Sequence, residues 1–158
     1  QKYFQAPVAC HHADAKVLCG ACAKPKQARG TAPIYQEVLN HFEDRFPARC
    51  QVDEEFEEGP WKWGFQVVHV PGHTDGSVML YHEPTRTLFS GDAILAGPPP
   101  LRIIEGLRLA LPGFSDDTDR CHENVRKFIA SLPKIEWLAA GHGPAVNSQV
   151  FEKIKKLL

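Results

Sequence analysis

Three apolar runs of this chain end in the same way, and these endings constrain the fold more than any other feature of the sequence. Each run leads into a glycine beside a histidine or an aspartate: Gly72-His73 after "FQVVHV", Gly91-Asp92 after "TLFS", and Gly141-His142 after "IEWLAA". Short apolar runs bounded by turn residues are typical of buried strands. Glycine lets the backbone turn sharply where a strand ends. We therefore predict three buried strands that present three polar side chains at turns.

The remaining segments predict a sheet covered by helices. Strands are expected in three further segments: 6–12, 49–59 and 77–83. The last of these forms an antiparallel hairpin with the strand that ends near Ile94. Amphipathic helices are expected in three segments: 33–46, 116–132 and 148–158. Asp116 or Asp117 is the expected cap of the second helix and Ser148 that of the third, whereas 101–111 is a short helix or a loop. This order of elements indicates an α/β fold, or a layered α+β fold, built by residues 1–158 as one domain.

The composition excludes several classes of function. The 18 basic and 19 acidic residues are mixed along 158 positions, so nothing points to nucleic acid or to a membrane surface as a partner. No apolar run is long enough to span a bilayer, and the first ten residues lack the apolar core of a secretion signal. The five cysteines are an odd number. Together with the missing signal, this number favours a reducing compartment, and we expect a cytoplasmic protein.

His73, Asp92 and His142 are the candidate metal ligands. The glycine beside each of them lets a metal come close, and strand ends hold such side chains on a rigid scaffold. Two imidazoles and one carboxylate suit zinc, iron or manganese. Each residue taken alone also has a structural explanation, because a histidine after glycine is often a turn residue and an aspartate after Ser-Gly often caps a helix. The residues by themselves leave both explanations open.

The motifs that contain these residues resemble those of a known family. "VPGHTDGS", "LFSGDAI" and "AAGHGP", in this order, resemble the C-terminal metal-binding motifs of the metallo-β-lactamase superfamily, which includes glyoxalase II-type thioesterases and lactonases. The resemblance implies the family's αβ/βα sandwich. It also implies that His73 binds a first metal, His142 a second, and that Asp92 bridges the two. The implied activity is hydrolysis by a metal-bound hydroxide.

The sequence departs from the family pattern upstream of these motifs. The family signature His-x-His-x-Asp-His, which supplies four ligands, is absent, and "CHHAD" instead resembles the strand and turn that follow it. The resemblance therefore implies a truncated sandwich that holds at most one metal per chain. Two functions stand: a metal-dependent hydrolase of a small ester, thioester or lactone with an incomplete site, or a non-catalytic remnant that acts as a binding protein. An uncovered sheet would favour a homodimer.

"CGAC" offers an alternative metal site. Cys19 and Cys22 have the spacing of a redox motif or of half a zinc knuckle, and Cys10 with His11 or His12 could complete a zinc site. A redox motif should open a helix after a strand, but a loop follows here. The alternative ligand set is thus Cys10, His12, Cys19 and Cys22, and incidental cysteines are the third explanation.

Overall fold

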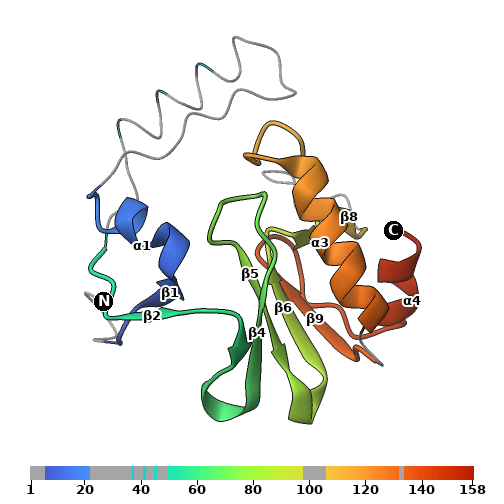
Figure 1. Cartoon of the computed structure of the whole chain (residues 1–158). Coiled ribbons are helices and arrows are strands. Elements are labelled where there is room, and N and C mark those ends of the chain that lie inside the picture. The colour runs from blue at the N-terminus through green and yellow to red at the C-terminus, as the bar shows by residue number, and fades with distance from the viewer. Residues whose placement is uncertain are drawn as a thin grey trace.

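A mixed five-stranded sheet forms the centre of the molecule (Figure 1). The computed structural model describes residues 6–21, 50–97, 106–131 and 134–158, together with Glu37, His41 and Arg45. The strand order is β3-β4-β5-β6-β9, with bounds Gly59–Pro60, Phe65–His69, Val78–His82, Thr87–Gly91 and Trp137–Ala140. The first four strands pair antiparallel, and β9 joins β6 in parallel. This arrangement confirms the predicted α/β fold.

The β5–β6 hairpin confirms the pairing predicted from the sequence. Its register sets Tyr81 opposite Leu88, two apolar residues whose side chains lie on the same face, as pairing across a pleated sheet requires. A short 3-10 turn, η2 Glu83–Thr85, joins the strands, and Arg86 follows it in the left-handed conformation at φ 51°. A similar turn, η1 Lys62–Gly64, precedes β4. Local sequence signals therefore specify this meander.

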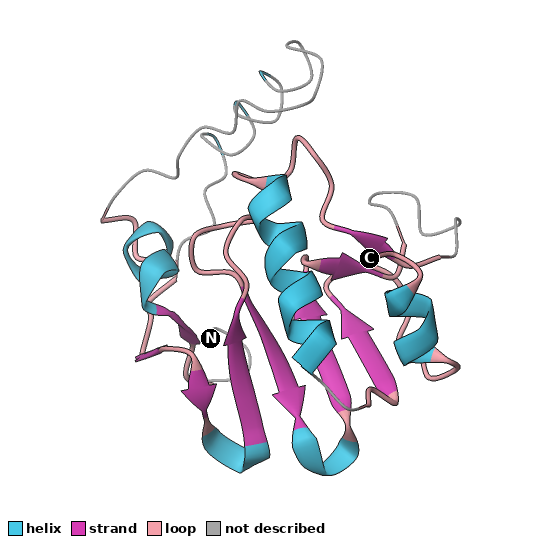
Figure 2. Cartoon of the chain, turned by 45° about the vertical axis from the view of Figure 1, so that its right-hand side comes forward, coloured by secondary structure: helices cyan, strands magenta, loops and turns pink. Residues whose placement is uncertain are grey.

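Helix α3, Thr118–Ser131, covers one face of the sheet (Figure 2). Its buried residues Cys121, Val125 and Ile129 recur every four residues and form the apolar stripe expected from the sequence. Asp117 caps its start, because a carboxylate oxygen of Asp117 accepts from the Arg120 amide at 3.1 Å. One of the two predicted caps is thus confirmed.

Helix α4, Val150–Lys155, begins differently from the prediction. Gln149 precedes it in the left-handed conformation and gives no side-chain cap. The Ser148 hydroxyl instead accepts from the Lys153 ammonium at 3.0 Å. The prediction of Ser148 as the cap is therefore wrong, although the helix itself exists.

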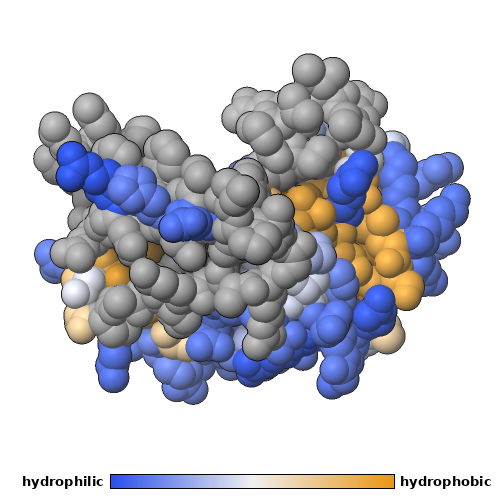
Figure 3. Space-filling view, turned by 90° about the horizontal axis from the view of Figure 1, so that it is seen from above, coloured by the Kyte–Doolittle hydropathy of each residue, from blue (hydrophilic) through white to orange (hydrophobic). Residues whose placement is uncertain are grey.

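The main core lies between the sheet and helices α3 and α4. Leu88 and Leu138 are fully buried there, whereas Phe89, the next residue along β6, is 41% exposed. Successive strand residues point to opposite faces, so Phe89 belongs to the face away from α3. Trp137 of β9 also stays 45% exposed. Seen from above, apolar surface gathers on the side of α3 and α4, bordered by hydrophilic residues (Figure 3).

A small unit from the N-terminal part of the chain lies beside the β4 side of the sheet (Figure 1). It consists of strands β1 and β2, paired in parallel, and a helix, α1, with bounds Ala9–His11, Glu54–Phe56 and His12–Leu18. Of the helix expected at 33–46, only Glu37, His41 and Arg45 are described, and each is helical. No helix in the described segments is long and apolar enough to cross a membrane.

A third sheet lies next to β6. Strands β7, Ile94–Leu95, and β8, Arg108–Leu109, pair antiparallel. Strand β8 falls in the segment 101–111, for which a short helix or a loop was expected. The helical alternative is wrong for residues 106–111, while residues 101–105 lie outside the described part of the chain.

Candidate metal centre

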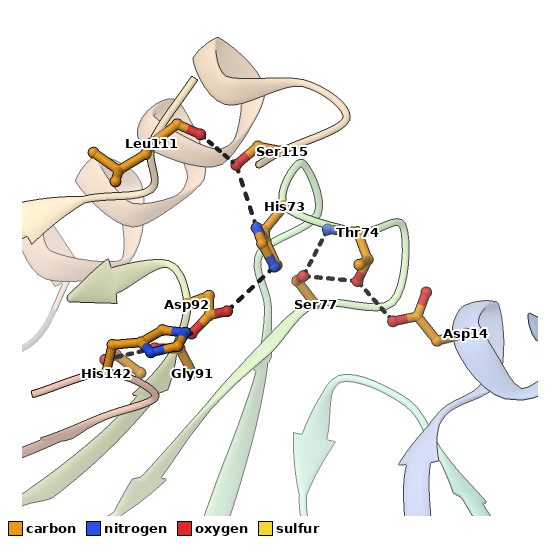
Figure 4. Close-up of polar contacts among 10 residues, drawn as sticks. Asp14, His73, Thr74, Ser77, Gly91, Asp92, Leu111, Ser115 and His142 are labelled. Carbon is orange, nitrogen blue, oxygen red and sulfur yellow. Dashed lines mark hydrogen bonds and ion pairs between the residues drawn. The ribbon is translucent and has the colours of Figure 1, made fainter. Parts of the chain in front are cut away.

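His73, Asp92 and His142 come together at one edge of the central sheet (Figure 4). Strands β4 and β6 both pair antiparallel with β5, so they run in the same direction, and β9 runs parallel to β6. The three strands therefore end at the same edge, where polar side chains that follow them meet. The side chains of His73, Asp92 and His142 are 24%, 30% and 45% exposed. They are accessible but held by their surroundings.

Each histidine faces a different oxygen of the same carboxylate. His73 Nε2 lies 3.4 Å from Asp92 Oδ2, and His142 Nε2 lies 3.6 Å from Asp92 Oδ1. Nitrogen and oxygen ligands bind zinc at about 2.0–2.2 Å, so two ligands of one tetrahedral ion lie about 3.4 Å apart. The donor types and the spacing of each pair therefore fit a metal.

The number of donors is smaller than a closed metal site needs. Within the described segments, no group of three or more His, Cys, Asp or Glu side chains is arranged so that it could hold one metal ion. The trio instead forms two histidine–carboxylate pairs that share Asp92. A metal at either pair would require further donors, whether from water, from substrate or from other residues.

The glycines Gly72 and Gly141, in two of the three motifs, are required by close packing. A Cβ at Gly141 would lie 2.2 Å from Asp92 Oδ1, so a side chain there would displace the carboxylate. Gly72 has φ +136°, and a Cβ there would lie 2.4 Å from the Asp117 carbonyl oxygen. Glycine thus lets the start of α3 and the end of β9 approach the centre closely.

The segment before α3 holds His73 from one side. His73 Nδ1 lies 3.3 Å from the hydroxyl of the buried Ser115. The backbone is bonded as well, because the amides of Asp116 and Asp117 donate to the carbonyls of His73 and Gly72 at 3.2 and 2.7 Å. Sequence reasoning missed Ser115, since no local pattern links it to a histidine 42 residues away.

Helix α1 holds the same turn from the other side. Asp14 accepts from the Thr74 hydroxyl at 2.6 Å and from the Gly76 amide at 2.8 Å. The Ser77 hydroxyl also accepts from the Thr74 amide at 2.9 Å, which closes the turn (Figure 4). The sequence pointed to Asp14 only as part of "CHHAD" and gave it no role. The two anchors together fix the backbone that carries His73.

The described members of the alternative site do not form a metal cluster. His12 begins α1 and Cys19 follows its end, so about 10 Å of helix separates them. Cys10 is half-buried, and burial, together with the nearby Asp14 carboxylate, raises the pKa of its thiol. A raised pKa disfavours the thiolate that binds metals. Cys22 lies outside the described residues.

His11, the other histidine considered for the alternative site, has a structural role. Its side chain is buried and stacks on the His69 ring at 4.0 Å between centroids. Burial is the main cause that lowers the pKa of His11, and the neighbouring His69 and His12 lower it further. Its Nδ1 accepts from the Ala13 amide at 3.3 Å, and it thereby caps α1.

Comparison with known proteins finds matches both in sequence and in structure. The sequence model of the metallo-beta-lactamase superfamily matches residues 1–142. An uncharacterized protein of Aquifex aeolicus (strain VF5) is 32% identical over 78 residues, which are 49% of this chain and 33% of that protein. The crystal structure of TTHA1623 in a di-iron-bound form aligns with a TM-score of 0.62 at 21% identity, over 99% of this chain and 65% of that one.

A further solved structure has the same fold. The BLEG-1 B3 metallo-beta-lactamase aligns with a TM-score of 0.54 at 24% identity, over 92% of this chain and 61% of that one. At these identities the likeness shows the fold alone. This chain spans less than two thirds of the length of each of the two solved structures, and about one third of the length of the Aquifex protein.

Proposed function

Because this chain belongs to the metallo-beta-lactamase superfamily, we propose that it is a metal-dependent, hydrolase-like protein that binds metal through His73, Asp92 and His142. The observation that carries the proposal is the convergence of two imidazoles on the two oxygens of one carboxylate. Such a donor set suits zinc, iron or manganese. TTHA1623, which has the same fold, was solved in a di-iron-bound form, and this supports iron within that range. The substrate we propose is a small molecule with an ester, thioester or lactone bond.

The residues of the centre have distinct roles in this proposal. One metal would be bound by Nε2 of His73 or of His142, together with the Asp92 oxygen that faces that histidine. A bound metal would supply Lewis acidity and a water of lowered pKa. The chain itself fixes the donors: Asp14 and the segment before α3 hold the His73 turn. The described side chains supply only part of the ligands of one metal ion, and we propose no more than one metal per chain.

Metal content tests this proposal. Tag-free wild-type protein is expected to hold up to one zinc, iron or manganese per chain, measured by mass spectrometry after dialysis. His142→Ala should bind zinc at least about 10-fold more weakly, because it removes one of the two imidazoles at Asp92. His12→Ala is the matched control, because it removes an exposed histidine of the alternative site and should leave the metal content unchanged.

The same experiment separates the competing explanations. Loss of metal in His12→Ala with retention in His142→Ala would assign the metal to the cysteine-containing site and sink the proposal. An absence of metal from wild type would favour the second candidate, a non-catalytic binding protein. This second candidate is supported by the small number of metal-binding side chains that come together in the described segments. Metal-dependent hydrolysis across a panel of esters, thioesters and lactones would reject it.

We also propose that the chain pairs with a second copy through the sheet face away from α3. Phe89 and Trp137 leave apolar surface exposed on β6 and β9, and exposed apolar surface on a sheet favours association. Light scattering should give twice the chain mass at micromolar concentration, and Phe89→Ser with Trp137→Ser should shift the protein toward the monomer. A monomer mass of wild type at every concentration would rule the dimer out.

The proposed location is the cytoplasm. Cys10, Cys19, Cys50 and Cys121 are free thiols in the structure, as expected in a reducing compartment. Burial raises the pKa of the Cys121 thiol to about 11, so this cysteine stays protonated and contributes to the core rather than to chemistry.

A further inference from the structure

Ser115 makes two hydrogen bonds, and only one assignment of its proton satisfies both. Its Oγ lies 3.3 Å from His73 Nδ1 and donates to the Leu111 carbonyl at 3.2 Å (Figure 4). A serine hydroxyl has one proton, and a carbonyl oxygen only accepts. The Ser115 proton therefore goes to Leu111, and Ser115 Oγ accepts the hydrogen bond from His73. This assignment requires a proton on Nδ1 of His73.

The position of that proton decides which nitrogen of His73 can bind a metal. A neutral imidazole carries one proton, so a proton on Nδ1 leaves the lone pair on Nε2. Nε2 is the nitrogen that lies 3.4 Å from Asp92 Oδ2. Without Ser115, the Asp92 carboxylate would attract the proton to Nε2, because an ionised carboxylate only accepts. Ser115 and Asp92 thus compete for the same proton from opposite sides of the ring.

From this geometry we propose that Ser115 is a positioning residue, which holds neutral His73 in the Nδ1–H tautomer and so presents Nε2 toward Asp92. The expected effect on metal affinity rests on the proposed function. The tautomer of His73 does not depend on it. Residues that bond to the second nitrogen of a metal-binding histidine typically change metal affinity by about 10- to 100-fold when removed.

The surroundings of Ser115 make it a fixed acceptor. Its side chain is fully buried, and its neighbours in the chain are bonded on both sides. The Phe114 amide donates to the Leu111 carbonyl at 3.3 Å, and the Asp116 amide donates to the His73 carbonyl at 3.2 Å. These backbone bonds do not involve the hydroxyl. Ser115→Ala therefore removes the acceptor of His73 and leaves the backbone that carries it in place.

Nitrogen NMR of the full metal-free chain tests the tautomer directly. Protein labelled with 15N in histidine is measured about two pH units above the ordinary histidine pKa of about 6.5, and the His73 signals are assigned with His73→Gln. Wild type should show the protonated nitrogen at Nδ1. Ser115→Ala should move the proton to Nε2, and Ser115→Thr, which keeps the hydroxyl, should restore Nδ1–H. A wild-type His73 protonated at Nε2 would overturn the proposal without any variant.

Ser90→Ala is the matched control for the tautomer. Ser90 is also fully buried and donates to a carbonyl, that of Ile94 at 2.7 Å, but it bonds to no histidine of the described segments. The variant should leave the His73 tautomer unchanged even where it lowers stability. A tautomer that moves equally in Ser90→Ala and Ser115→Ala would reflect general loosening and contradict a specific role for Ser115.

Zinc titration then measures the consequence. Ser115→Ala should weaken zinc binding by about 10- to 100-fold, and Ser115→Thr should recover most of the affinity. Unchanged affinity in Ser115→Ala would contradict the role of Ser115 in metal binding. If wild type binds no zinc, the proposed function fails, whereas the NMR result still decides the tautomer. The two failures are therefore distinguishable.

Discussion

Gly72→Ala is expected to destabilise the chain by about 2–6 kcal/mol, the sum of a conformational and a steric contribution. The residue has φ +136°, a backbone conformation that alanine adopts only at a cost of about 1–3 kcal/mol. The new Cβ would also lie 2.4 Å from the Asp117 carbonyl oxygen and 2.5 Å from the Cys121 amide nitrogen. Both are backbone atoms at the start of α3, so relief requires the helix to move, which adds about 1–3 kcal/mol. Denaturation in urea measures the loss as a change in the free energy of unfolding.

Gly59→Ala separates the two contributions. Gly59 has nearly the same backbone angle, φ +133°, but among the described residues no heavy atom beyond its two chain neighbours lies within 4 Å of the Cβ that alanine would add. This variant should therefore lose only the conformational part, about 1–3 kcal/mol. Equal losses in the two variants would mean that α3 does not pack on the Gly72 turn as described.

Leu88→Ala is expected to lower the free energy of unfolding by about 2–5 kcal/mol. Leu88 is fully buried in β6, between β5 and β9 and beneath the helices. Truncation there removes apolar burial and leaves a cavity that strands held on both sides do not close. Chemical denaturation and the melting temperature both report the loss.

Phe89→Ala is the control, because it removes a larger side chain from the next position in the same strand. Phe89 is 41% exposed on the opposite face, so its loss should cost less than about 2 kcal/mol when measured at the lowest workable protein concentration. A loss as large as that of Leu88→Ala would show that a further segment of the chain, or a second copy, covers Phe89 under the conditions of the measurement.

The strands could be predicted from the sequence because their signals are local. Val67 and Val68 in "FQVVHV" mark a strand buried on both faces, and both are buried in β4. The hairpin of β5 and β6 follows from the short turn at residues 83–86. The parallel pairing of β6 with β9 has no local signal, since the paired residues Leu88 and Leu138 lie about 50 positions apart. That pairing is what brings His142 to Asp92.

The errors have the same cause. Ser148 resembles a cap by residue type, but the backbone enters α4 through a left-handed Gln149, and no propensity rule predicts such a conformation for glutamine. Residues 108–109 form a strand because Ile94 and Leu95 are available as a partner, so tertiary pairing overrides the helical pattern of "LRIIEGLRLAL". Ser115 is likewise defined only by the residues that surround it in space.

The two hydrogen bonds of Asp14 have a consequence for the order in which the chain assembles. They join residues 60 and 62 positions apart, whereas the strands β4, β5 and β6 join near neighbours in sequence. Closing a long loop carries an entropic cost that local contacts avoid, and folding slows as contacts become more distant. We therefore expect the meander to form its hairpins before α1 docks. The turn that carries His73 would then become rigid only when α1 docks. The docking of the N-terminal unit would therefore set when the candidate centre is complete.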